Sequence, residues 1–315
     1  MIDNLHYESG ELEKVLESKT SPLEQKLFAC LFTADKTFIN RFLLELGRDL
    51  ANDNASLGRV ALFLTATHLT NGNLAAANQQ FSQLTNSIFE SGNLTSFFAS
   101  LAGLIQELLR DDIKLEKTIL SENGALIGDS HTLSLSYLWA QPTSEVFYLP
   151  GLTLRGLSSP QKNSYIQAIE NATSVSLRKD HLTFSIGEID ARNLYTHFAK
   201  ILVKKSYKDI MSETIRTSLN FVYGLRAPYQ EFYIFNLPGF NPALVEKENL
   251  KHKAKIKSLY CEFKEVFSQT AVEIGFNLID HKEMLETEHI NNLVDHAHFH
   301  PSFYQTILAG YLSST

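Results

Sequence analysis

The sequence is poor in cysteine and contains no long apolar run. Only two of its 315 residues are cysteines. Cys30 and Cys261 lie far apart, which excludes a disulfide framework and the usual cysteine spacings of a zinc site, so we expect a reducing compartment. Residues 1–8 lack the basic start and apolar core of a signal peptide, and no apolar stretch reaches bilayer-spanning length. The sequence therefore predicts a cytoplasmic protein with no membrane partner.

The chain also lacks an excess of positive charge. Its formal net charge is −7 at pH 7, and the most basic stretch, residues 251–257, is typical of the solvated face of a helix. Nucleic-acid phosphates are bound by a concentrated basic face, so the composition argues against a nucleic-acid partner. The hydrophobic content of 44% and charged content of 20% are ordinary for a globular protein.

Residues 1–118 are predicted to form an all-helical domain, because apolar side chains recur there three and four positions apart. Residues 70–73 separate two such segments and are typical of a turn between helices. Gly72, Ala77 and Phe81 occupy positions that match a tetratricopeptide helix pair. An ordinary helical bundle explains the same pattern, since real arrays need several repeats. One expected role of this domain is to bind a protein partner.

From residue 121 to residue 315 the pattern changes to short apolar strands that alternate with helices. We predict an α/β fold: a flavodoxin-like three-layer α/β/α domain with a mainly parallel five-stranded sheet, preceded by the all-α domain. The predicted strands are 125–127, 145–149, 181–186, 231–237 and 273–279. The predicted helices are 132–139, 165–172, 197–223 and 249–271. In such sheets the functional groups gather at the carboxyl ends of the strands.

The first predicted strand ends abruptly in Gly128-Asp129-Ser130-His131. A turn in this place carries Ser130 to the carboxyl edge of the sheet, where it is a candidate nucleophile. A serine there is also the usual N-cap of the next helix, and the tetrapeptide by itself leaves both interpretations open. We expect Asp129 to hydrogen-bond to nearby backbone and fix the turn.

A second motif lies near the end of the chain. Asp295 and His298 are spaced so that the carboxylate can orient the imidazole, which can then accept a proton from a serine hydroxyl. His296, His298 and His300 alternate along the same stretch and could instead form a zinc site. Catalytic zinc ligands usually stand one helical turn apart, and zinc would not explain Ser130. We therefore predict no metal and no cofactor.

Together these motifs resemble the SGNH (GDSL-type) hydrolase superfamily over residues 121–315. Ser130 corresponds to the family's nucleophile, and Asp295-x-x-His298 corresponds to its acid and base. The glycine turn after the second strand corresponds to the block that supplies an oxyanion donor, with Gly151 as the expected donor and Gly156 as the alternative. The resemblance implies catalysis by these residues.

The third block of the family normally reads Gly-x-Asn-Asp, and here the segment is Gly187-Glu188-Ile189-Asp190. Isoleucine donates no hydrogen bond, and the loss of one oxyanion donor typically slows a reaction by about 10²- to 10³-fold. Arg192 is the predicted replacement, because a guanidinium can donate to an oxyanion or to a substrate carboxylate. The alternative is that Glu188, Asp190 and Arg192 form an ion-pair network that stiffens the loop.

The resemblance implies a serine esterase or deacylase acting on an O-acyl, preferably O-acetyl, ester of a carbohydrate or small metabolite. An O-acyltransferase would need the same residues, so acyl transfer stays open. A third interpretation is a catalytically weakened domain that serves in binding or scaffolding. Ile189 favours that interpretation, and the presence of Ser130, Asp295 and His298 opposes it.

Overall fold

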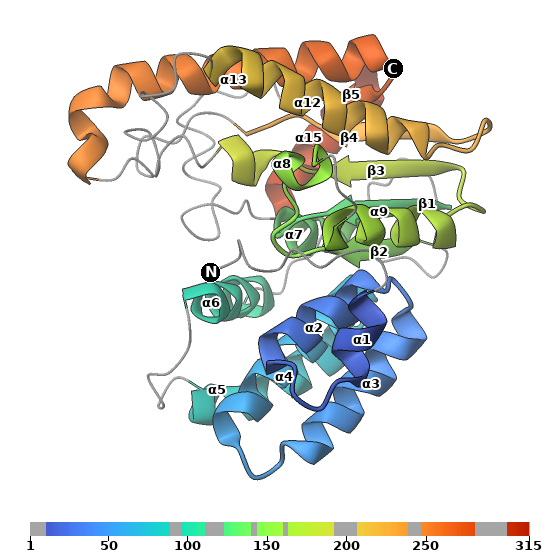
Figure 1. Ribbon diagram of the computed structural model, residues 1–315, viewed down its shortest axis with the longest axis vertical. Coiled ribbons are helices and arrows are strands. Elements are labelled where there is room, and N and C mark those ends of the chain that lie inside the picture. The colour runs from blue at the N-terminus through green and yellow to red at the C-terminus, as the bar shows by residue number, and fades with distance from the viewer. Residues whose placement is uncertain are drawn as a thin grey trace.

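The computed structural model shows a group of helices followed by an α/β unit (Figure 1). It describes residues 11–88, 96–110, 123–139, 144–159, 163–191, 207–238, 247–280 and 301–314. Asp295, His298 and Arg192 lie outside these ranges. None of the helices in the described ranges combines the length and the apolar character that a membrane crossing requires.

The N-terminal region is helical throughout its described part. Its elements are α1 (Glu11–Glu17), α2 (Leu23–Phe32), α3 (Lys36–Asp49), α4 (Asn54–Thr70), α5 (Leu74–Ile88) and α6 (Ser96–Arg110). Asp53 caps α4 by accepting hydrogen bonds from the backbone N–H groups of the first turn. Helices α4 and α5 are the predicted pair, joined at Gly72, whose φ of +70° suits glycine. Ala77 and Phe81 are buried, as the pattern predicts.

Five parallel strands form one sheet in the order β2-β1-β3-β4-β5. They are β1 (Gly124–Gly128), β2 (Glu145–Tyr148), β3 (His181–Ser185), β4 (Glu231–Phe235) and β5 (Asn277–Ile279). This is the strand order of flavodoxin-like sheets, so the predicted fold class is confirmed. Strand β5 begins at Asn277 rather than at residue 273, because the preceding helix continues to Ile274 and ends at Gly275, where φ is +112°.

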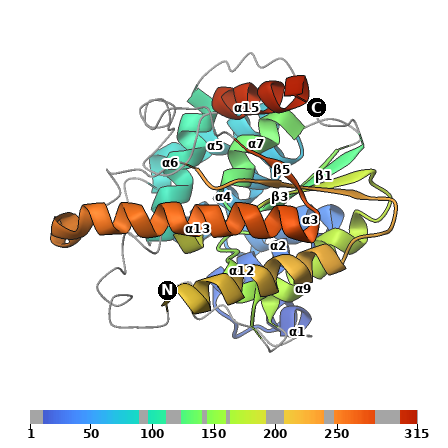
Figure 2. The ribbon, with the colours of Figure 1, turned by 90° about the horizontal axis from the view of Figure 1, so that it is seen from above.

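Helices cover both faces of the sheet, which gives three layers (Figure 2). One layer holds α7 (His131–Trp139) and α15 (Pro301–Ser314); the other holds α9 (Ser164–Val175), α12 (Tyr207–Gly224) and α13 (Lys253–Ile274). Alternate side chains of β1 pack against the helices on opposite faces of the sheet. Leu126 packs in the cluster of α7 and α15, whereas Ala125 and Ile127 join the larger core on the opposite face. The strand is therefore apolar throughout, as expected for a sheet buried on both sides.

The helical region packs directly against the α/β unit, and both contribute to one continuous hydrophobic cluster. Helix α2 contacts α9, where the rings of Phe32 and Tyr165 lie 5.5 Å apart and Asn171 donates to the Phe32 carbonyl (3.0 Å). Helix α4 contacts both α7 and β2. Because β2 is an edge strand, this contact covers a sheet edge that would otherwise be open to pairing with another chain.

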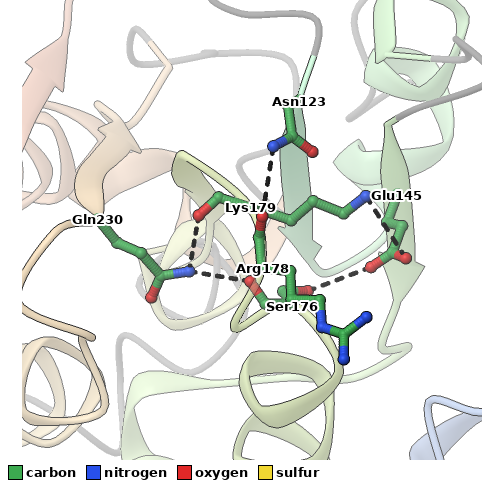
Figure 3. Close-up of polar contacts among 6 residues, drawn as sticks. All are labelled: Asn123, Glu145, Ser176, Arg178, Lys179 and Gln230. Atoms are coloured by element: carbon green, nitrogen blue, oxygen red, sulfur yellow. Dashed lines mark hydrogen bonds and ion pairs between the residues drawn. The ribbon is translucent and has the colours of Figure 1, made fainter.

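A polar network holds the amino edge of the sheet, opposite to the edge where Ser130 lies (Figure 3). Gln230, which is buried, donates to the backbone carbonyls of Ser176 (2.9 Å) and Lys179 (3.0 Å) in the loop after α9. Asn123 donates a further hydrogen bond to this loop (3.3 Å), and Lys179 lies 3.6 Å from the Glu145 carboxylate. The network ties the loop to the starts of β1, β2 and β4.

We expect Gln230→Ala to lower the free energy of unfolding by about 2 kcal/mol, because it removes the two hydrogen bonds that this buried side chain donates to loop carbonyl groups. Chemical denaturation monitored by circular dichroism measures this change. Gln269→Ala is the control: Gln269 is exposed on α13 and bonds only to Glu265 (3.2 Å), so its effect should stay within about 0.5 kcal/mol. Equal stabilities of the two variants would contradict a role for this network.

Candidate active site

The candidate site lies at the carboxyl edge of the sheet, beyond β1 and β3. From β1 the chain crosses to β2 on one side, and from β2 it crosses to β3 on the other, so the direction of winding reverses here. In open parallel sheets, ligands bind in the crevice at this switch point. Ser130 directly follows β1, and Gly187 to Asp190 follow β3. The strand order therefore brings these two predicted blocks to the same place.

Gly128 allows a close backbone contact at the switch point. A Cβ atom at this position would lie 2.2 Å from the carbonyl oxygen of Ser185, so no other residue fits without a shift of backbone. The next N–H, that of Asp129, donates to the same carbonyl (3.1 Å). On the other side, the Leu149 N–H donates to the Gly128 carbonyl (2.7 Å). The turn that follows β1 is thereby held between the ends of both neighbouring strands.

The turn itself is closed by Asp129, which is fully buried. Its carboxylate accepts a hydrogen bond from the His131 N–H (3.0 Å), and its carbonyl accepts one from the Thr132 N–H (3.0 Å). The expected role of Asp129 in fixing the turn is confirmed. Ser130 is partly exposed, whereas every other residue from 124 to 136 is buried. The fold thus presents this serine at the surface of an otherwise inaccessible stretch.

Gly151 lies in a tight turn after β2. The Leu152 N–H donates to the Leu149 carbonyl (3.2 Å), and Gly151 has a φ of +77° after a proline, as the third residue of a type II turn does. The Gly151 N–H makes no hydrogen bond to the described part of the chain. By contrast, the Gly156 N–H is already bonded to the Thr153 hydroxyl (3.0 Å). Among the described residues, therefore, none takes up the Gly151 N–H.

Asp190 joins the segment after β3 to the segment after β2. Its carboxylate accepts from the backbone N–H groups of Leu154 (2.7 Å) and Arg155 (3.2 Å) at the start of α8 (Leu154–Leu157). Burial raises the pKa of this carboxyl to about 6; the two hydrogen bonds lower it, and the negative charge of Asp129 raises it. Asp190 therefore holds the start of α8 in place, just beyond the Gly151 turn.

Glu188 lies in a second polar group, with two residues from other elements. Its carboxylate is 3.5 Å from His131 Nε2, while His131 Nδ1 is 2.8 Å from the hydroxyl of Tyr304 on α15. Burial, with the charges of Asp129 and Glu188, raises the pKa of Tyr304 well above its ordinary value, so the phenol is neutral. Both ring nitrogens of His131 thus lie near side chains from other elements.

The sequence motifs indicate no role for His131 or Tyr304. A signal for α15 is present, because Pro301 suits the first position of a helix and apolar residues follow at helical spacing. No sequence signal indicates that Tyr304 contacts His131. His131 and Tyr304 are far apart in the sequence, and only the packing of α15 against α7 brings them together.

A small cavity of about 20 Å³ adjoins this group and has room for one water molecule. His131, Glu188 and Asn236 contribute its polar lining, and Phe235 and Phe303 lie on its apolar side. Asn236 follows β4 and donates to the carboxylate of Asp280 after β5 (2.8 Å). Polar side chains therefore continue along the carboxyl edge to the last strand.

The remaining predicted site residues lie outside the described ranges. These are His298 and Asp295, Arg192, and the histidines of the alternative zinc site. In the described ranges, histidine, cysteine and carboxylate side chains form no group of three that could hold a metal ion. Glu188 and Asp190 have separate partners in these ranges, an imidazole and two backbone N–H groups respectively.

No protein-family model matches the sequence, and no curated protein matches it. Solved structures similar to this chain include LAE5, an alpha/beta hydrolase enzyme from the metagenome of Lake Arreo, Spain. That match covers 63% of this chain and 97% of LAE5, with 13% identity and a TM-score of 0.39. A second solved structure matches over 62% of this chain and 97% of its own, with 13% identity and a TM-score of 0.40. These likenesses concern the layout of strands and helices and say nothing about chemistry.

The raised pKa of Asp190 predicts a specific pH dependence of stability. The unfolded carboxyl ionises near pH 4 and the folded one near pH 6, so the native state loses stability as the pH rises through this window. Between pH 4 and 6.5 we expect wild type to lose about 2 kcal/mol relative to Asp190→Asn, less than the full shift implies because the side chain is partly exposed. Urea denaturation of both proteins across this range measures the difference, and parallel curves would contradict the assignment.

Proposed function

We propose that this protein is a serine hydrolase of the SGNH type that removes an acyl group, preferably acetyl, from an ester of a carbohydrate or small metabolite. The observation that carries the proposal is the exposure of Ser130 alone within the buried stretch 124–136, at the switch point of a parallel sheet. In addition, the Asp129 carboxylate already accepts a hydrogen bond from an N–H group of the first turn of α7, which is the usual task of a helix cap. The choice of substrate follows from the family resemblance.

In the proposed mechanism His298, oriented by Asp295, accepts the proton of the Ser130 hydroxyl as its oxygen attacks the ester carbonyl carbon. The tetrahedral intermediate collapses, and the alcohol leaves with the proton from His298. Water then attacks the acyl-enzyme and gives a proton to His298. The acid departs as that proton returns to Ser130.

The negative charge that develops on the carbonyl oxygen needs donors at the carboxyl edge. We assign this role to the backbone N–H groups of Gly151 and Ser130, with Arg192 as the third donor in place of an asparagine at position 189. The Gly151 N–H supports the first assignment, because it makes no hydrogen bond to the described residues. A second alcohol in place of water would make the same site an O-acyltransferase.

A binding or scaffolding module with weakened catalysis is the second candidate function. Ile189 is the observation that favours it, because this side chain cannot donate to an oxyanion. The helical region would then recruit a partner.

Labelling with a fluorophosphonate probe tests the proposed nucleophile. We expect the wild type to be labelled and Ser130→Ala not to be, because the probe reacts only with an activated serine. Turnover of 4-nitrophenyl acetate should fall by at least about 10³-fold in Ser130→Ala and in His298→Ala.

Ser134→Ala is the matched control for this experiment. Ser134 lies one helical turn after Ser130, and its buried hydroxyl makes no hydrogen bond to the described part of the chain, so labelling and turnover should be retained. A folded wild type that stays unlabelled would favour the binding module, and an active Ser130→Ala would refute the nucleophile.

The variant Ile189→Asn tests the oxyanion donors. Because Arg192 is assigned as the third donor, we expect kcat to stay close to that of the wild type; a rise of about 10-fold or more would contradict this assignment, since one donor typically contributes about 10²- to 10³-fold. Ile189→Val, which adds no donor, should leave kcat unchanged. If Ile189→Asn also leaves kcat unchanged, another group such as Arg192 already fills that place.

A further inference from the structure

We propose that His131, Glu188 and Tyr304 are positioning residues: they hold α15, the helix that begins shortly after His298 in the sequence, against the turn that carries Ser130. This inference rests on the proposed function and goes beyond it, because none of the three residues belongs to the proposed mechanism. They form a buried polar link between segments that are distant in the sequence.

Each member of the link adjoins one part of the proposed site. His131 follows Ser130 directly, and Glu188 precedes Ile189 in the block after β3. Tyr304 lies in the first turns of α15, which begins at Pro301 shortly after His298. The link therefore joins three segments: the turn that carries Ser130, the segment after β3, and the start of the helix that follows His298 in the sequence.

The contacts fix His131 in one orientation. Its Nδ1 lies 2.8 Å from the Tyr304 hydroxyl and its Nε2 lies 3.5 Å from the Glu188 carboxylate. The three side chains are only 3%, 7% and 6% exposed for His131, Glu188 and Tyr304 respectively. Buried polar groups cost free energy unless they are paired, so losing the hydrogen bond between His131 and Tyr304 would be unfavourable. Apolar side chains of similar size would fill the space without this directional constraint.

Beside the link, α15 also contributes apolar side chains to the core. Phe303, Ile307 and Leu308 pack against Leu126 of β1 and Leu135 of α7. Apolar packing is non-directional and tolerates small shifts of a helix along its neighbours. The hydrogen bond of Tyr304 to His131 sets the position of α15 along α7 much more narrowly.

The position of α15 limits where the proposed base can lie, because His298 is close to the start of this helix in the sequence. Position 301 is three residues after position 298, and three residues of chain span at most about 11 Å. A displacement of 1 Å in the reacting geometry can cost about 10²-fold in rate. The link therefore governs how well His298 meets Ser130 without itself touching the substrate.

Tyr304→Phe tests the link, because it removes only the hydroxyl and keeps the ring contacts with Phe235 and Phe303. We expect kcat for 4-nitrophenyl acetate to fall 10- to 100-fold with KM within twofold of wild type and the melting temperature within a few degrees. The control is Tyr311→Phe on the same helix, whose ring packs on Tyr233 away from the link; its kcat should not change. An unchanged kcat in Tyr304→Phe would overturn the proposal.

Hydrogen–deuterium exchange of the same variants separates this inference from the proposed function. We expect faster exchange in peptides from residues 281–300 of Tyr304→Phe and not of Tyr311→Phe, whether or not the protein hydrolyses esters. Wild-type exchange in Tyr304→Phe would overturn the link itself. A wild type with neither labelling nor turnover would refute the proposed function and, with it, the catalytic consequence of the link, while faster exchange would still support the contact.

Discussion

The candidate site depends on one close backbone contact, between the end of β1 and the end of β3. Gly128 has no Cβ, so its backbone can approach the Ser185 carbonyl, which then accepts the N–H of Asp129. This contact decides where β1 stops and where α7 begins. It also decides that Ser130, and not a neighbour, emerges at the switch point. A side chain at position 128 would separate the strands just where the two blocks of the site must meet.

Carboxylates around this contact are each held by a different kind of donor. Asp129 accepts from the backbone of its own turn, Glu188 faces an imidazole, and Asp190 accepts from the start of α8. Because burial disfavours their charged forms, each needs its donor to remain in place. The segments after β1, β2 and β3 are consequently tied to one another, and Tyr304 adds the C-terminal helix to the same assembly.

Hydrogen bonds at the opposite, amino edge of the sheet stabilise the fold. There Gln230 and its loop hold the starts of the strands together by hydrogen bonds to backbone carbonyls. The helical region covers the edge strand β2 through α4 and shares its hydrophobic cluster with the α/β unit. By contrast, the polar side chains of the candidate site, a small cavity and the partly exposed Ser130 lie at the carboxyl edge.

The sequence by itself determined the strands, most helices and the turn at Gly128 to His131, because hydrophobic periodicity and glycine act over short stretches. It also indicated the strand-to-helix positions of Ser130 and Gly151. It did not determine the partners of Glu188 and Asp190, the hydrogen bond of His131 to Tyr304, or the covering of β2. These depend on which distant segments meet, and that was decided only when the strands took the order β2-β1-β3-β4-β5 and α15 packed on α7.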